Sequence, residues 1–104
     1  KELTDEDFGQ FIGQKKITIV DFWAPWCGPC RISSPIFDEL AQGKEFAGKV
    51  EFAKMNVDEN PQIPGRFGIF SIPTFLIFKD GGQIGEIHGA LPKAEFREKL
   101  RDYL

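Results

Sequence analysis

The stretch Ile17-Thr18-Ile19-Val20-Asp21-Phe22-Trp23-Ala24-Pro25-Trp26-Cys27-Gly28-Pro29-Cys30 decides the fold of this chain. It begins with a near-continuous apolar run, which is typical of a strand covered on both faces, as in a parallel sheet. Beyond the second cysteine, apolar residues recur at helical spacing from about Ile32 to Leu40. We therefore predict a strand, a short loop and a helix, with both cysteines of the chain where the loop becomes the helix.

Two residues separate Cys27 from Cys30 at this predicted helix start. A helix N-terminus carries partial positive charge and unpaired backbone N–H groups, so it favours a thiolate over a thiol. Residues three apart in a helical turn lie on one face, which allows the two sulfurs to join. Pro29 suits a first helical turn, and Gly28 leaves Cys27 sterically open. The pattern indicates a redox dithiol in which Cys27 attacks and Cys30, one turn deeper, is less exposed.

Two other interpretations of the cysteine pair stay open. Structural zinc sites use four nitrogen or sulfur ligands, and this chain offers only His88 beside the two cysteines. A static disulfide between Cys27 and Cys30 would close a very small loop, with a modest entropic benefit. If the pair is a redox dithiol, we expect no metal and no bound organic cofactor, because the cysteines are themselves the redox group.

Length and charge limit the class of protein. The chain has 104 residues, a length that predicts one domain, residues 1–104. Its net charge is −3. The sequence has no basic run of the kind that binds nucleic acid. No apolar segment approaches the roughly 20 residues that are needed to cross a bilayer. No signal peptide is visible, so we expect a cytoplasmic protein. We also expect a monomer. Because the chain starts at Lys1 rather than Met, an organelle or a trimmed precursor stays open.

Local signals predict the remaining elements. Thr4 followed by Asp7 indicates a capped helix start. Asp80-Gly81-Gly82 is a hairpin signal. The predicted elements are a first helix with Phe8, Phe11 and Ile12, strands at 50–57, 74–78 and 83–88, a short broken helix near 60–65, and a last helix over 92–104 with Phe96, Leu100, Tyr103 and Leu104 on one face. The expected class is α/β, with a mixed central sheet flanked by helices, βαβ first and ββα last.

The run Trp23-Ala24-Pro25-Trp26-Cys27-Gly28-Pro29-Cys30 resembles the active-site signature of the thioredoxin family. Matching landmarks cover nearly the whole chain: residues 53–58, Asn60-Pro61, Ile72-Pro73-Thr74 and Gly89-Ala90. The resemblance implies the thioredoxin fold with an N-terminal extension. Thioredoxins are known for a lowered cysteine pKa, and the resemblance implies the same for Cys27. It also implies a protein-disulfide reductase that acts on disulfide-containing proteins and receives electrons from thioredoxin reductase.

Asp21 interrupts the apolar strand, and Lys54 lies in the next predicted strand. From the residues alone, Asp21 is either a solvated strand end or a buried carboxyl with a raised pKa. The corresponding aspartate of the family lies beneath the second cysteine, so the resemblance implies proton exchange by Asp21. Lys54 would tune Asp21, with an exposed strand lysine as the alternative. The expected catalytic residues are Cys27, Cys30, Asp21 and Lys54.

An aromatic residue in the loop beside a thiol predicts an apolar docking patch at Trp26, whereas Trp23 is expected to pack structurally. X–Pro bonds are mostly trans, but the family has a cis proline opposite its cysteines. The resemblance therefore implies a cis Ile72–Pro73 bond and backbone groups free to pair with an extended substrate. It maps Phe70 and His88 to the groove rim, where many relatives carry a charged and an aliphatic residue. The expected substrate-binding residues are Trp26, Gly28, Pro29, Phe70, Ile72, Pro73, Gly89 and Ala90.

Two alternative functions use the same fold. One reverses the chemistry, to a disulfide oxidase or isomerase; Gly28-Pro29 and Asp21 instead resemble the reducing members. The other is a binding or scaffold module without redox chemistry, because a fold by itself does not determine function.

Overall fold

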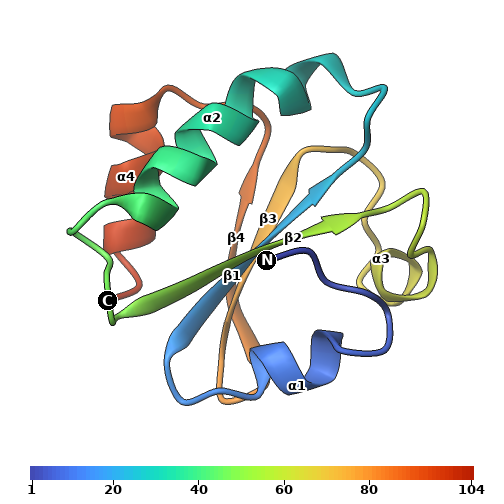
Figure 1. Cartoon of the computed structure of the whole chain (residues 1–104), viewed down its shortest axis with the longest axis horizontal. Helices are drawn as coiled ribbons and strands as arrows, with labels where there is room; N and C mark the ends of the chain where they lie inside the picture. Colours follow the sequence, from blue (N-terminus) through green and yellow to red (C-terminus); the bar gives the residue numbers. More distant parts are fainter.

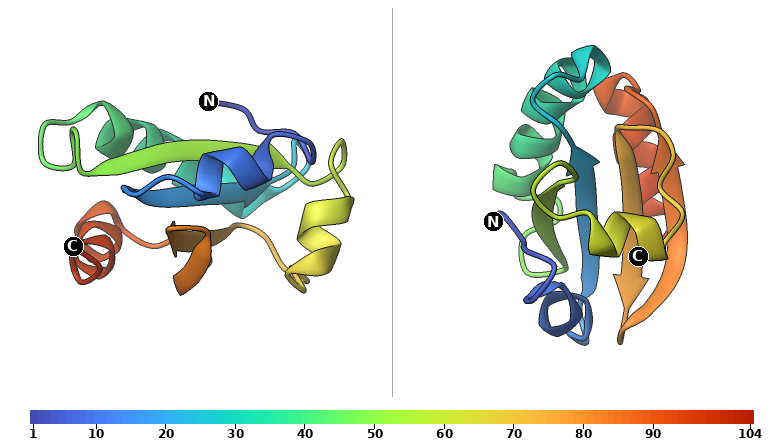
Figure 2. Two further views of the ribbon diagram at one scale, coloured as in Figure 1. Left: turned by 90° about the horizontal axis from the view of Figure 1, so that it is seen from below. Right: turned by 90° about the vertical axis from the view of Figure 1, so that its right-hand side faces the viewer.

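The computed structural model describes all 104 residues, Lys1–Leu104, and has eight regular elements. Four strands form one mixed sheet in the order β2-β1-β3-β4, which the right-hand view of Figure 2 shows from left to right. β1 pairs parallel with β2, and the other neighbours are antiparallel. This confirms the predicted α/β architecture, βαβ followed by ββα (Figure 1). The elements are α1 (Phe8–Ile12), β1 (Ile17–Trp23), α2 (Gly28–Gln42), β2 (Val50–Asn56), α3 (Gln62–Arg66), β3 (Thr74–Lys79), β4 (Gly82–His88) and α4 (Lys93–Arg101).

The central strand β1 is buried on both faces, as its apolar run predicts. Successive side chains of a strand point to opposite faces of a sheet. Val20 packs in one cluster with Phe8 of α1 and Ile63 of α3, whereas Ile19 packs in the other with Phe37 of α2 and residues of α4. In Figure 1, α2 and α4 accordingly lie to one side of the sheet, and α1 and α3 lie to the other. By this alternation, Asp21 shares the face of Ile19, beneath α2 and α4.

Helix α2 begins at Gly28, four residues before the apolar pattern that predicted it. Its buried positions are Cys30, Ser33, Phe37 and Leu40, spaced by three and four residues. Ile32, expected on the buried face, is instead 65% exposed, so that expectation is wrong. Ser33 takes the core position because its hydroxyl donates to the carbonyl oxygen of Cys30 at 3.3 Å and needs no water.

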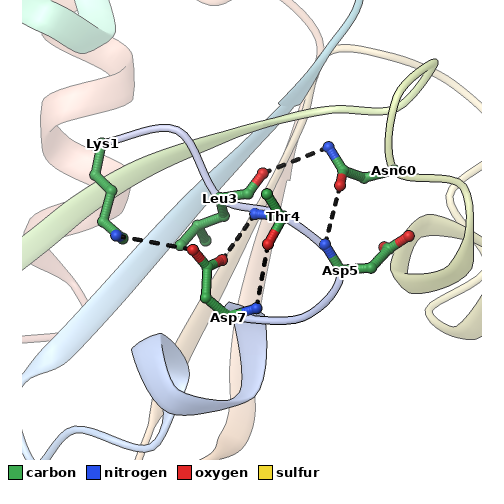
Figure 3. Close-up of polar contacts among 6 residues, drawn as sticks. All are labelled: Lys1, Leu3, Thr4, Asp5, Asp7 and Asn60. Carbon is green, nitrogen blue, oxygen red and sulfur yellow. Dashed lines mark hydrogen bonds and ion pairs between the residues drawn. The ribbon is translucent and has the colours of Figure 1, made fainter.

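The N-terminal extension joins the edge of β2. The backbone N–H of Leu3 donates to the carbonyl oxygen of Lys54 at 2.7 Å. The Thr4–Asp7 pair, predicted as a capped helix start, makes two reciprocal bonds: Thr4 N–H donates to Asp7 Oδ1 at 2.7 Å, and Asp7 N–H donates to Thr4 Oγ1 at 3.3 Å (Figure 3). These bonds close a turn before the helix, whereas α1 itself begins at Phe8 and its N-cap, Asp7, makes no side-chain cap bond. This turn leads directly into α1.

The same extension also supports α3. Asp5 accepts hydrogen bonds from the backbone N–H groups of Gln62 and Ile63, at 3.2 and 2.9 Å. Asn60 accepts from Asp5 N–H and donates to the carbonyl oxygen of Leu3 (Figure 3). Helix α3 has only five residues, with one proline as its N-cap and another inside it. The free N–H groups of its first turn are therefore satisfied by the side chain of Asp5, from a distant part of the chain.

The predicted hairpin is confirmed, but the last helix is shorter than the predicted 92–104 and runs from Lys93 to Arg101. Asp80 and Gly81 have φ of 53° and 85°, the left-handed conformation of a tight hairpin turn between β3 and β4. Phe96 and Leu100 of α4 are buried, but Leu104 is 54% exposed, because the helix ends at Arg101. None of the helices combines the length and the apolar character that a membrane span requires.

Candidate active site

Cys27 is the N-cap of α2, and a disulfide joins it to Cys30 in the first turn, with 5.3 Å between their Cα atoms. The predicted pairing of the two sulfurs is therefore seen. The backbone N–H of Cys30 donates to Cys27 Sγ at 3.1 Å, so the sulfur takes the place of a capping oxygen. Negative charge on Cys27 Sγ would be stabilised both by this N–H and by the positive end of the α2 dipole.

The two cysteines are equally buried in this oxidised form, with exposed fractions of 3% for Cys27 and 4% for Cys30. The expectation that Cys27 is open and Cys30 less exposed is wrong here. Cys27 packs against Ala24, and the carbonyl oxygen of Ile72 lies 3.7 Å from its sulfur. Cys30 instead borders a pocket of about 130 Å³, whose other lining residues are Trp23, Ala24, Pro25, Arg31 and Ser34.

Asp21 is a buried carboxyl, with 1% of its surface exposed, so the solvated strand end is excluded. Burial raises its pKa from 3.8 to about 7, because desolvation penalises the charged form. The positive charge of Lys54 acts in the opposite direction, and the negative charges of Asp38 and Glu2 add to the rise. Asp21 Oδ1 has no hydrogen-bond partner.

Lys54 is the register neighbour of Asp21 across β1 and β2 but makes no ion pair with it. Its Nζ lies 2.9 Å from Asp38 Oδ1 and donates to Ser34 Oγ at 2.7 Å. Only 19% of its side chain is exposed, so the alternative of an exposed strand lysine is wrong. Lys54 therefore influences Asp21 through its charge, without an ion pair or hydrogen bond to it.

The residues expected to dock a substrate include two exposed aromatic side chains. Trp26 is 67% exposed, and Phe70 is 98% exposed. The indole N–H of Trp26 donates to Asp58 Oδ2 at 2.9 Å, which fixes the ring orientation. Gly28 and Pro29 are exposed in the first turn of α2. Trp23 is half-buried against the cysteine cluster, in agreement with a packing role.

The loop before β3 meets the cysteine pair. The Ile72–Pro73 bond is cis, as the resemblance implied, and the Ile72 carbonyl faces Cys27. The backbone N–H of Gly89 donates to the carbonyl oxygen of Pro73 at 2.9 Å, and half-buried Ala90 follows it. The loop before β3 thus reaches Cys27 through Ile72, and the residue after β4 is bonded to the next residue of that loop.

His88 lies on the exposed side of β4. Its Nε2 is 3.2 Å from Glu86 Oε1, and its Nδ1 is 3.4 Å from Thr74 Oγ1. The structure contains no group of three or more His, Cys, Asp or Glu side chains that could hold a metal ion. That the protein works without a metal remains a prediction.

Three residues with defined contacts at the site were missed from the sequence. Ser34 and Asp38 hold Lys54, and Asp58 holds Trp26. A signal for the first two was present, because Cys30, Ser34 and Asp38 recur every four residues and so share a helix face. No comparable local pattern marks Asp58.

Comparison with known proteins gives consistent matches. A family model described as Thioredoxin matches residues 1–102. The chloroplastic M-type thioredoxin of Pisum sativum is 52% identical over 93 residues, which are 89% of this chain and 53% of that protein, so the chain spans about half its length. Thioredoxin 1 of Nostoc sp. is 44% identical over 104 residues, covering 99% of this chain and 95% of that one. A crystal structure of Malassezia sympodialis thioredoxin has a TM-score of 0.89 and 34% identity, covering 97% of this chain and 87% of that one.

These matches confirm the predicted fold and family, and they do not favour an oxidase, an isomerase or a scaffold module. The disulfide at the start of α2 supplies the redox pair on which such chemistry depends. The chain therefore belongs to the thioredoxin family, and it is a thiol–disulfide oxidoreductase of the protein-disulfide reductase type.

Proposed function

We propose that Cys27 attacks disulfides of partner proteins and that Cys30 resolves the resulting mixed disulfide. The observation that carries this assignment is the hydrogen bond from Cys30 N–H to Cys27 Sγ, 3.1 Å long, at the start of α2. When the disulfide opens, the same N–H and the helix dipole stabilise negative charge on Cys27. Cys30 has no equivalent position, because it lies inside the first turn.

The proposed cycle starts from the dithiol form. The Cys27 thiolate attacks one sulfur of the substrate disulfide, and the other substrate sulfur leaves as a thiolate. Cys30, once deprotonated, attacks Cys27 Sγ, which releases the second substrate thiolate and restores the Cys27–Cys30 disulfide. Two electrons have passed from the dithiol to the substrate. An external reductant must then return them, and thioredoxin reductase is the proposed donor.

Asp21 is the proposed acceptor of the Cys30 proton in the second step. Its carboxyl lies on the sheet face that α2 covers, and burial raises its pKa to about 7. A group with a pKa near the working pH can both accept and release a proton. Lys54 tunes this carboxyl electrostatically.

The proposed substrate is an extended segment around a disulfide in another protein. Trp26 and Phe70 supply exposed apolar surface, and the Ile72 backbone beside Cys27 offers hydrogen-bonding groups to an extended strand. Gly28, Pro29, Pro73, Gly89 and Ala90 complete the proposed contact surface. We further propose that the protein works as a cytoplasmic monomer without cofactor or metal.

Reduction of insulin disulfides, with dithiothreitol as the electron source, tests this function. Cys27→Ser should abolish catalysis, and Cys30→Ser should accumulate a mixed disulfide through Cys27. Insulin reduction that survives in both variants would contradict the assignment, whereas a wild-type protein that does not reduce insulin would favour a scaffold module. A redox potential measured against glutathione separates a reductase from an oxidase, since a reductase has the more negative potential.

A further inference from the structure

Helix α2 carries a row of polar side chains that the proposed cycle does not use. Ser34 and Asp38 follow Cys30 at intervals of four residues, so the three side chains share one face of the helix. Ser34 also lines the pocket that Cys30 borders. The row therefore begins at the resolving cysteine and continues along the helix toward Asp38.

Lys54 reaches this row from β2. Its ammonium donates to Ser34 Oγ at 2.7 Å and lies 2.9 Å from Asp38 Oδ1. Phe52, two residues earlier in β2, packs with the α2 side of the core, so by strand alternation Lys54 points to the same side. Asp21, its neighbour in the sheet register, makes no ion pair, and Asp21 Oδ1 has no partner.

We infer that Ser34 is a positioning residue that, together with Asp38, holds the Lys54 ammonium on α2 and away from the Asp21 carboxyl. The inference rests on the proposed role of Asp21. An ammonium in contact with Asp21 would favour the ionised carboxylate and make it a weaker base toward the Cys30 thiol. Two anchors on α2 keep the ammonium from making that contact.

The charges that act on Asp21 come from three segments: Lys54 on β2, Asp38 on α2 and Glu2 in the N-terminal extension. Replacing Asp38 would remove an anchor and a negative charge together. Ser34→Ala removes an anchor and changes no charge, so it isolates the positioning effect. Alanine is a strong helix former, and Ser34 lies inside a 15-residue helix, so the variant is expected to fold.

The test is a carbon-13 NMR titration of the Asp21 carboxyl in the oxidised protein, with Asp21→Asn used to assign the signal. In Ser34→Ala we expect the Asp21 pKa to fall by about 0.5 unit or more, because the ammonium is freer to approach. Ser34→Thr keeps the hydroxyl and should titrate like the wild type. If the alanine variant does not fold, Ser34→Val is compared with Ser34→Thr instead, because these two side chains have the same shape and differ only in the hydroxyl that binds Lys54.

Ser33→Ala is the matched control, since its hydroxyl bonds only to the Cys30 carbonyl and does not touch Lys54. An Asp21 pKa that is unchanged or raised in Ser34→Ala overturns the inference, as does an equal fall in Ser33→Ala. The titration requires no turnover. Failure of the proposed function would appear separately, as a wild-type protein that does not reduce insulin while the titration difference persists.

Discussion

Replacing Asp21 with Asn should make stability less dependent on pH. Burial raises the Asp21 pKa from 3.8 to about 7, and each unit corresponds to about 1.4 kcal/mol, so the full effect is about 4 kcal/mol. Below pH 4 the carboxyl is protonated in the folded and the unfolded chain, and it contributes no pH dependence. Between pH 4 and 7 only the unfolded chain ionises, so the wild-type free energy of unfolding falls as pH rises. Above pH 7 the folded protein carries the whole cost of a buried charge.

The variant has no charge at position 21, so it escapes this loss. Its free energy of unfolding, relative to wild type, should rise by up to about 4 kcal/mol from pH 4 to pH 8. An unpartnered buried amide costs about 1–3 kcal/mol, but that cost is the same at every pH and cancels in the comparison. Urea denaturation of both oxidised proteins at pH 4, 6 and 8 measures the difference.

Glu59→Gln serves as the control, because Glu59 is exposed and its variant should follow the wild type at every pH. A difference between Asp21→Asn and wild type that stays constant across this range would refute the argument from burial. Asp21→Asn should also reduce insulin more slowly than wild type near neutral pH, since the resolving step by Cys30 then lacks its proton acceptor.

Three further outcomes follow from the structure. Trp26→Ala should lower kcat/KM about tenfold for insulin but little for a small-molecule disulfide, because the exposed ring contributes docking surface; equal losses for both substrates would contradict this. Phe37→Ala should destabilise the fold by about 3–5 kcal/mol in urea, since Phe37 packs against three other phenylalanine rings; a loss below about 1 kcal/mol would show that the cluster repacks. Asp5→Ala should cost about 1 kcal/mol in thermal unfolding by uncapping α3, whereas Glu6→Ala, at an exposed neighbour of Asp5 in the sequence, should cost little.

Most of the fold was predictable because its signals are local. The apolar run of β1, the Thr4–Asp7 pair and the Asp80-Gly81 turn each depend on residues near one another in the chain, and the structure has all three. One wrong assignment came from the same kind of local signal. Ile32 fits an apolar helical pattern, yet Ser33 takes the buried position because its hydroxyl is satisfied by the backbone of its own helix.

The sequence by itself determined the strand–loop–helix unit, the pairing of Cys27 with Cys30 and the helix start that favours a charged sulfur. These features depend on a few consecutive residues and their backbone preferences. Only the tertiary structure decided that Asp21 is buried without a partner and that Lys54 bonds to α2 instead. Burial and charge pairing depend on which distant segments pack together, and no local pattern encodes which of two carboxylates an ammonium group will pair with.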